Sequence, residues 1–98
     1  MVLQRAEAPP RAINFDGENY VPTIARVGPY RLFFYAGDRD EPPHVHVERD
    51  DALAKLWLDP VRLQHAAGFR AAELRQIQRL VAEQQAALLE AWHDYFDG

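Results

Sequence analysis

Short segments of aromatic and β-branched residues occupy the middle of the chain, and turn-forming residues separate them. Such segments, bounded by Gly, Pro or Asp, are typical of β-strands. We expect four strands, at residues 23–27, 30–36, 44–48 and 53–58, and residues 61–65 would add a fifth, short strand. Their close spacing along the chain predicts antiparallel neighbours joined by short connections.

The last third of the chain follows a different period. Apolar residues recur there at spacings of three, four or seven, which place them on one side of a helix. This stripe consists of Leu74, Ile77, Val81, Leu88, Trp92 and Tyr95. Neither Gly nor Pro interrupts the segment, so we predict one long helix over about residues 70–96. The pattern as a whole predicts an α+β fold: an antiparallel sheet of about four strands with one long C-terminal helix packed across one face.

The first 21 residues lack this regularity. Residues 1–11 contain the run E-A-P-P and no hydrophobic period, which is typical of a mobile arm. In residues 12–22 the Asp16-Gly17 pair suggests a turn, in an irregular hairpin. We therefore expect a partly ordered N-terminal arm at residues 1–21 and a single α+β domain at residues 22–98.

Pairing of the third and fourth strands defines two faces of the sheet. With residues 49–52 as the loop, the opposed pairs are Glu48 with Leu53, His46 with Lys55, and His44 with Trp57. Opposed side chains share a face, so one face holds His44, His46, Glu48, Lys55 and Trp57. The other face holds Val45, Val47, Ala54, Leu56 and Leu58, which are all apolar. A slip of one residue would turn the valines outward, so we expect the helix on the valine face and the histidine face in contact with solvent.

The expected core combines the valine face with the helical stripe. It contains Leu32, Phe34, Val45, Val47, Leu56, Leu58, Leu74, Ile77, Val81, Leu88 and Trp92. Both faces of strand 30–36 are apolar, so a single covering helix would leave Phe33 and Tyr35 exposed. Such a patch is unfavourable in water. We expect it to be covered in a homodimer or by the N-terminal arm.

The chemistry of the chain concentrates in Asp38 to Val47, which reads D-R-D-E-P-P-H-V-H-V. Histidines two apart on a strand point to the same side, and two such imidazoles can chelate a divalent metal such as zinc if a third ligand is present. The eligible carboxylates are Glu48 on the same strand and Asp38, Asp40 and Glu41 on the preceding loop. We take His44, His46 and Glu48 as the first candidate set of metal ligands.

Two other interpretations of the histidine pair stay open. As an acid–base pair, His44 and His46 would flank a phosphodiester while Lys55 stabilises negative charge. As structural residues, His44 would stack on Trp57, and His46 would form a hydrogen bond with Glu48 or with a loop carboxylate.

Composition removes several function classes. The chain has 98 residues, a net charge of -4, and neither cysteine nor serine, so a disulfide framework, a thiolate metal site and a serine nucleophile are excluded. The charge disfavours stand-alone binding of nucleic acid. We recognise no phosphate-binding loop, signal peptide or membrane-spanning run, and we expect a cytoplasmic protein that does not associate with a membrane.

Two isolated histidines and an acidic helix end complete the candidate residues. We expect His65 at the surface and His93 near the end of the helix. Glu90, Asp94 and Asp97 lie in the last turns, where the helix dipole disfavours anions. Their placement favours either a solvated tail or a docking end for a basic partner.

Several segments resemble one family of small bacterial proteins, known as domain of unknown function 4160. The resemblance extends from Pro22 to the C-terminus, and its motifs are P-T-I-A-R at Pro22 to Arg26, the strand ending in F-F-Y, D-E-P-P-H-V-H-V, and a helix ending near Trp92. It implies a compact α+β domain, often encoded beside a second small protein, and a pairing of the toxin–antitoxin type has been proposed for some members. His44 and His46 would then belong to a toxin active site or a partner-docking site. The segment before Pro22 and a hairpin with few glycines depart from the family pattern.

These observations give two functional expectations. The first is an interaction protein, one component of a two-protein module, which binds a small partner from a neighbouring gene through the polar sheet face or the acidic helix end. The alternative is a metal- or histidine-dependent hydrolase of the phosphodiester class, centred on His44 and His46. An autonomous DNA-binding regulator is disfavoured, because we find no helix-turn-helix pattern.

Overall fold

The computed structural model of the chain describes residues 4–5 and 23–97. Most of the predicted N-terminal arm, including the expected turn at Asp16-Gly17, lies outside the described residues. Within residues 1–21, only Gln4–Arg5 are described, and they form a two-residue strand.

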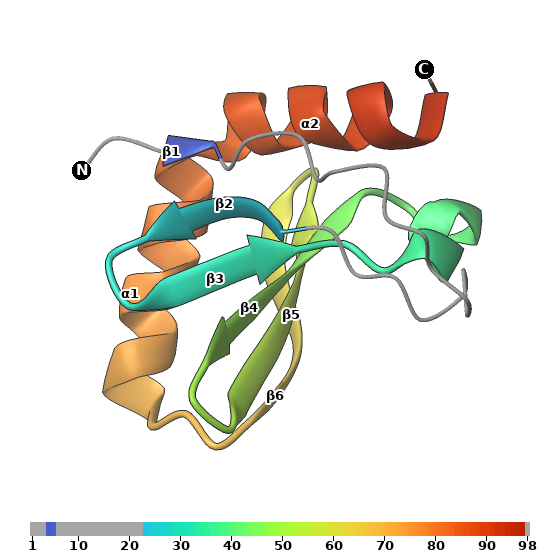
Figure 1. Cartoon of the computed structure of the whole chain (residues 1–98). Coiled ribbons are helices and arrows are strands. Elements are labelled where there is room, and N and C mark those ends of the chain that lie inside the picture. Colours follow the sequence, from blue (N-terminus) through green and yellow to red (C-terminus); the bar gives the residue numbers. More distant parts are fainter. Residues whose placement is uncertain (1–3, 6–22, 98) are drawn as a thin grey trace.

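The described chain forms an antiparallel sheet followed by two helices (Figure 1). The sheet has six strands in the order β1-β2-β3-β4-β5-β6, and every pair of neighbours is antiparallel. The strands are β1 (Gln4–Arg5), β2 (Thr23–Val27), β3 (Tyr30–Phe33), β4 (His44–Arg49), β5 (Ala52–Leu58) and β6 (Val61–Ala67). The helical segments are η2 (Ala36–Asp40), α1 (Ala71–Glu83) and α2 (Gln85–Asp97). The predicted α+β class is confirmed, with more strands than the four expected.

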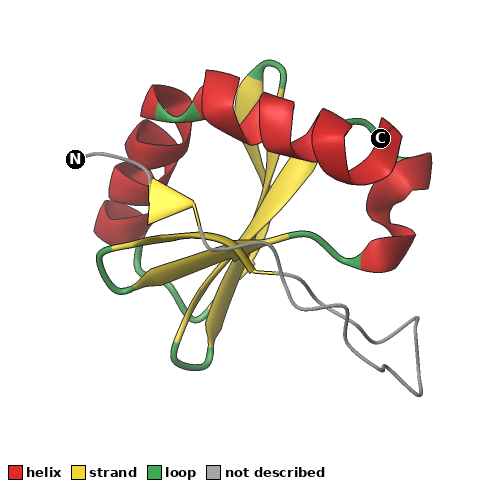
Figure 2. Ribbon diagram, turned by 45° about the horizontal axis from the view of Figure 1, so that its top comes forward, coloured by secondary structure: helices red, strands yellow, loops and turns green. Residues whose placement is uncertain are grey.

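Both α-helices cover the same side of the sheet, as Figure 2 shows. The burial pattern of strand β5 agrees with this arrangement. Half-buried residues alternate along it with the buried residues Ala52, Ala54, Leu56 and Leu58. The predicted register of β4 with β5 is confirmed, with His44 opposite Trp57 and His46 opposite Lys55. The valine face therefore forms the core, as the strand period of two requires.

The expected core is confirmed in all but one position. Leu74 is only half-buried, at the edge of the core cluster. Of the two residues that a single covering helix was expected to leave exposed, Phe33 is only 2 % exposed. The guanidinium of Arg31 lies 4.5 Å from the centre of the Phe33 ring, and the His46 ring stacks on it at 5.3 Å. Tyr35 remains exposed, at 37 %.

The C-terminal helical segment differs from the single long helix that was predicted. It divides at Gln84, whose φ of -105° and ψ of 10° leave the helical region. The Gln84 N–H donates to the carbonyls of Leu80 and Val81, which closes α1. The Gln85 Nε2 donates to the Leu58 carbonyl at 2.6 Å, which ties the start of α2 to the end of β5. As a result, α1 and α2 run in different directions (Figure 1).

The segment after β3 positions the histidines. Strand β3 ends at Phe33, earlier than the predicted residue 36, and the loop that was expected at residues 37–43 contains the short helix η2. Two prolines then lead into β4 at His44. Among the described residues, no helix combines the length and the apolar composition needed to cross a membrane.

Candidate metal centre

The structure brings the two histidines of β4 together. The ring centres of His44 and His46 are 5.1 Å apart, and the rings meet edge to face. The prediction that they are accessible to solvent is wrong, because His44 is 0 % exposed and His46 is 6 % exposed. Helix η2 lies over this end of β4, and the Trp92 ring of α2 approaches His44 to 5.0 Å.

A carboxylate from η2 lies between the two rings. The Oδ2 atom of Asp38 is 3.1 Å from His44 Nε2 and 3.0 Å from His46 Nε2. Asp38 is itself buried, at 7 % exposure, and one ligand atom from each of the three residues lies within 4.8 Å of the other two. We call Asp38, His44 and His46 the central triad.

The backbone of η2 fixes the position of Asp38. Its N–H donates to the Tyr35 carbonyl at 3.0 Å, and its own carbonyl accepts from the Glu41 N–H at 3.0 Å. The Tyr35 N–H in turn donates to Asp38 Oδ2 at 2.8 Å. The carboxylate is therefore held by its own turn, independently of the histidines.

The hydrogen bonding of His44 leaves one ring nitrogen available. Its Nδ1 lies 2.8 Å from the Pro42 carbonyl, which can only accept, so Nδ1 carries the proton. In a neutral ring Nε2 then has a lone pair, and this buried atom has no hydrogen-bond partner among the described residues. It faces Asp38 Oδ2 at 3.1 Å. The lone pair of His44 Nε2 and the negatively charged Asp38 Oδ2 repel each other unless a proton or a metal ion lies between them.

The ring of His46 shows a related deficit. Its Nε2 lies at hydrogen-bond distance from Asp38 Oδ2, while its buried Nδ1 has no hydrogen-bond partner within the described part of the chain. Buried polar atoms without partners are rare and costly in folded proteins. The triad therefore contains two ring nitrogens to which the described part of the chain offers no hydrogen bond.

Electrostatics keep Asp38 ionised. Burial alone would raise the pKa of its carboxyl group, but hydrogen bonds from His44 and His46, donated when a proton lies on the facing ring nitrogen, and from the Tyr35 N–H outweigh burial and lower the pKa well below its usual range. Asp38 is thus a carboxylate at neutral pH, which is the form that binds metal.

Aromatic rings enclose the triad. Trp57 meets His44 edge-on at 5.6 Å, and Tyr35 meets His46 at 4.6 Å. These contacts match the structural interpretation in part, since His44 touches Trp57 and His46 is bonded to a loop carboxylate, although Trp57 is edge-on and not stacked. Water-poor surroundings also strengthen any interaction of the triad with a cation.

The other candidate residues lie apart from the triad. Glu48 forms an ion pair with Arg31 at 3.2 Å and is absent from the group of converging ligand atoms. Lys55 pairs with Glu41 at 2.5 Å, and Asp40 is exposed. Of the four carboxylates eligible by sequence, Asp38 is therefore the one placed between the histidines.

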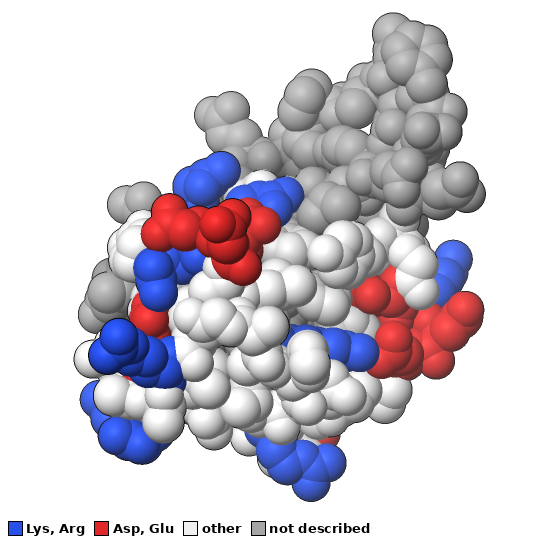
Figure 3. Space-filling view, turned by 90° about the horizontal axis from the view of Figure 1, so that it is seen from below, with Lys and Arg blue, Asp and Glu red and all other residues white. Residues whose placement is uncertain are grey.

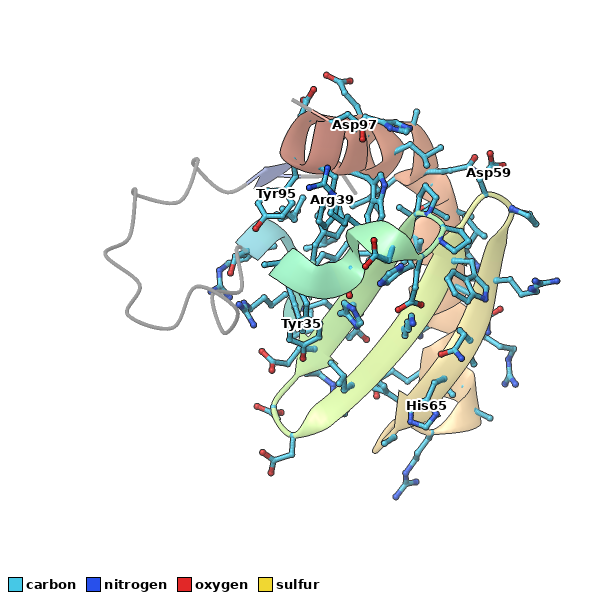
Figure 4. The ribbon with its side chains drawn as sticks, turned by 90° about the vertical axis from the view of Figure 1, so that its right-hand side faces the viewer. Tyr35, Arg39, Asp59, His65, Tyr95 and Asp97 are labelled. Carbon is cyan, nitrogen blue, oxygen red and sulfur yellow. The ribbon has the colours of Figure 1, made fainter. Side chains whose placement is uncertain are left out.

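The isolated histidines take no part in the triad. His65 is exposed on β6, and His93 Nδ1 lies 2.6 Å from Asp97 on the same helix. Figure 4 shows His65 far from η2, with Arg39 directed from η2 toward α2. Arg39 Nη2 donates to the Phe96 carbonyl at 3.0 Å, which fastens η2 to the end of α2.

A surface hollow of about 320 Å³ lies elsewhere, between β3 and α1. It is lined by Tyr30, Gln76, Arg79, Leu80 and Glu83, and it shares no residue with the triad. The triad is thus a buried cluster and does not line this hollow.

The donor set fits a divalent transition metal. Two imidazole nitrogens and one carboxylate oxygen suit zinc, and also iron, nickel or copper, better than calcium or magnesium. The His44–Pro42 bond is the type of outer contact that orients a metal-binding imidazole. Three protein donors leave one position of a tetrahedral ion for a further ligand.

Comparison with known protein families gives a match over most of the chain. A family described as "Domain of unknown function (DUF4160)" matches residues 30–93, a range that contains the whole triad. No curated protein and no solved structure matches.

Proposed function

The chain belongs to the DUF4160 family, and we propose that it binds one divalent metal ion of the zinc class through Asp38, His44 and His46. One observation carries this proposal: ligand atoms of three buried residues converge within 4.8 Å, and one of them is an imidazole nitrogen that faces a carboxylate and has no hydrogen-bond partner among the described residues. A metal ion satisfies both groups at once.

The bound ion would act as a clamp between elements. Asp38 belongs to η2 and the histidines to β4, so coordination holds η2 on the sheet. The contact of His44 with Trp92 and the bond from Arg39 to the Phe96 carbonyl extend this clamp to α2. Because the unfolded chain has no preformed site, the free energy of metal binding adds to the free energy of folding.

A double substitution separates this proposal from its rivals. We expect His44→Ala/His46→Ala protein, purified in parallel with the unchanged chain, to lack the zinc or nickel that the unchanged chain retains in elemental analysis. It should also melt at a lower temperature, and a chelator should lower the melting temperature of the unchanged chain alone. Equal metal content in the two proteins would contradict the proposal.

The proposed biological setting is one half of a two-protein, toxin–antitoxin-like module with a small partner from a neighbouring gene. Support comes from the family resemblance and from α2, whose Glu90, Asp94 and Asp97 are exposed on its surface. Since the histidines are buried, this acidic helix end is the surface that remains for docking a basic partner. Co-expression with the product of the adjacent gene tests it: Glu90→Lys should reduce co-purification, whereas Arg62→Glu on β6 should not.

The hydrolase alternative makes further demands. Lys55 is held by Glu41, and a substrate would have to reach buried imidazoles. This alternative predicts that His44→Ala/His46→Ala abolishes hydrolysis or growth inhibition while the melting temperature hardly changes. A lower melting temperature without lost activity favours the metal clamp.

A further inference from the structure

We infer that the metal-bound site takes a small oxyanion, such as phosphate, with the ion as its first anchor and Lys55 as its second. This inference rests on the proposed metal site. In it, Glu41 is the internal carboxylate that the oxyanion displaces from Lys55.

Lys55 lies on the same face of the sheet as the triad. Its Cα is paired with that of His46 across β4 and β5. Its Nζ lies 5.0 Å from the centre of the Trp57 ring, and the same ring touches His44. The ammonium group is therefore beside the triad and not at the far end of the strand.

Glu41 is far more exposed than the members of the triad that lie beside it. Its side chain is 45 % exposed, against 10 % for Asp38 and 8 % for His46. The hydrogen bond from Lys55, together with the charge of its ammonium group, lowers the pKa of the Glu41 carboxyl group. Phe33, Tyr35 and Trp92 cover the rings elsewhere, which leaves the Glu41–Lys55 pair as the polar margin of the site.

A bound metal ion reverses the net charge of the triad together with Glu41 and Lys55. With neutral imidazoles, Asp38, Glu41 and Lys55 together carry one net negative charge, which repels anions. A divalent ion changes this to one net positive charge. Displacement of Glu41 from Lys55 then lets an oxyanion bind the ion through one oxygen and the ammonium through another, as charge-assisted bonds.

The charges around Lys55 explain why the Glu41 carboxylate competes with an incoming anion. On the face shown in Figure 3, acidic side chains gather in groups that lie beside basic side chains, while other basic side chains stand apart from them. Lys55 is paired with Glu41, so an incoming anion gains only what exceeds the Glu41 contact. Removal of the Glu41 charge should therefore strengthen anion binding.

Calorimetric titration of the zinc-loaded chain with inorganic phosphate tests the inference. We expect phosphate to bind the zinc-loaded chain and not the metal-free chain. Glu41→Gln should tighten binding and Lys55→Met should weaken it, each on the order of tenfold, as expected for one charge-assisted bond. Glu48→Gln, which removes a carboxylate from the same strand face but outside the triad, should leave binding unchanged.

The outcomes distinguish this inference from the metal proposal. If the zinc-loaded chain binds no phosphate, or if Lys55→Met binds it as tightly as the unchanged chain, the inference is overturned while the metal site stands. Equal phosphate binding by the metal-free chain would also overturn it. If the chain takes up no zinc at all, the metal proposal itself fails. Melting curves of each variant show that the fold is kept, since Glu41 and Lys55 are partly exposed.

Discussion

At the scale of single residues, the site depends on how Asp38 is turned back toward residues that follow it in the chain. Its carboxylate reaches His44 and His46 because η2 reverses the chain and Pro42-Pro43 extend it into β4. The strand period predicted that the two histidines lie side by side. It could not select Asp38 among four carboxylates, because an irregular loop has no period that fixes where its side chains point.

Leu56 tests the orientation of the sheet. It is fully buried between strands and helices, and we expect Leu56→Ala to lower the free energy of unfolding by about 2–5 kcal/mol. Leu53, half-buried on the opposite face of the same strand, is the matched control, with an expected loss below about 1 kcal/mol for Leu53→Ala. Similar losses in chemical denaturation would mean that the faces are wrongly assigned.

Glu73 provides a pH-dependent test. A hydrogen bond from Arg49 lowers the pKa of its carboxyl group in the folded chain, and a weaker effect of the same sign comes from the hydrogen bond of Tyr30. A lowered folded pKa stabilises the fold above the unfolded value of about 4.3, and this contribution is lost as the pH falls. We therefore expect Glu73→Gln to melt below the unchanged chain at pH 7, with a difference that shrinks toward pH 3.

Glu83→Gln, on the exposed side of the same helix, serves as the control and should change the melting temperature little at either pH. A difference for Glu73→Gln that grows as the pH falls would show that the ion pair with Arg49 does not stabilise the fold.

At the scale of elements, the sequence predicts the strands and their register better than the helices. Alternation of apolar and polar residues placed β4 opposite β5 correctly, because a slip would expose the valines. The division of the C-terminal segment at Gln84 had no local signal, since neither Gly nor Pro lies there and the apolar stripe continues from Val81 to Leu88. The start of α2 is held instead by a contact with a strand distant in sequence, the hydrogen bond from Gln85 to the Leu58 carbonyl of β5.

The connection between β6 and α1 offers a prediction at this scale. Gly68 has a φ of +89°, and a Cβ built on it would lie 3.0 Å from both Cα and Cβ of Ala52. We expect Gly68→Ala to cost about 1–3 kcal/mol, from strain and from this contact. Gly37→Ala, where a Cβ meets nothing within 4 Å, should have an effect within about 0.5 kcal/mol. If urea denaturation gave Gly68→Ala and Gly37→Ala the same stability, the positive φ and close contact at Gly68 would be contradicted.

At the scale of the whole molecule, the triad lies where η2, β4 and α2 meet. The predicted exposure of the histidine face failed here, because its cover comes from η2 and from Trp92, which is distant in sequence. Burial of Phe33 also removes part of the patch that suggested a homodimer, and leaves Tyr35 exposed. Homodimer formation stays a prediction, which light scattering of the full chain tests.

Titration of the metal-free chain with zinc tests the central claim most directly. The account predicts one zinc ion per chain, with affinity reduced by at least about tenfold in Asp38→Asn, which keeps the shape of the side chain but removes the ionised ligand. Glu48→Gln should bind zinc like the unchanged chain, because Glu48 is paired with Arg31. A chain that binds no zinc, or an Asp38→Asn variant with unchanged affinity, would contradict the account.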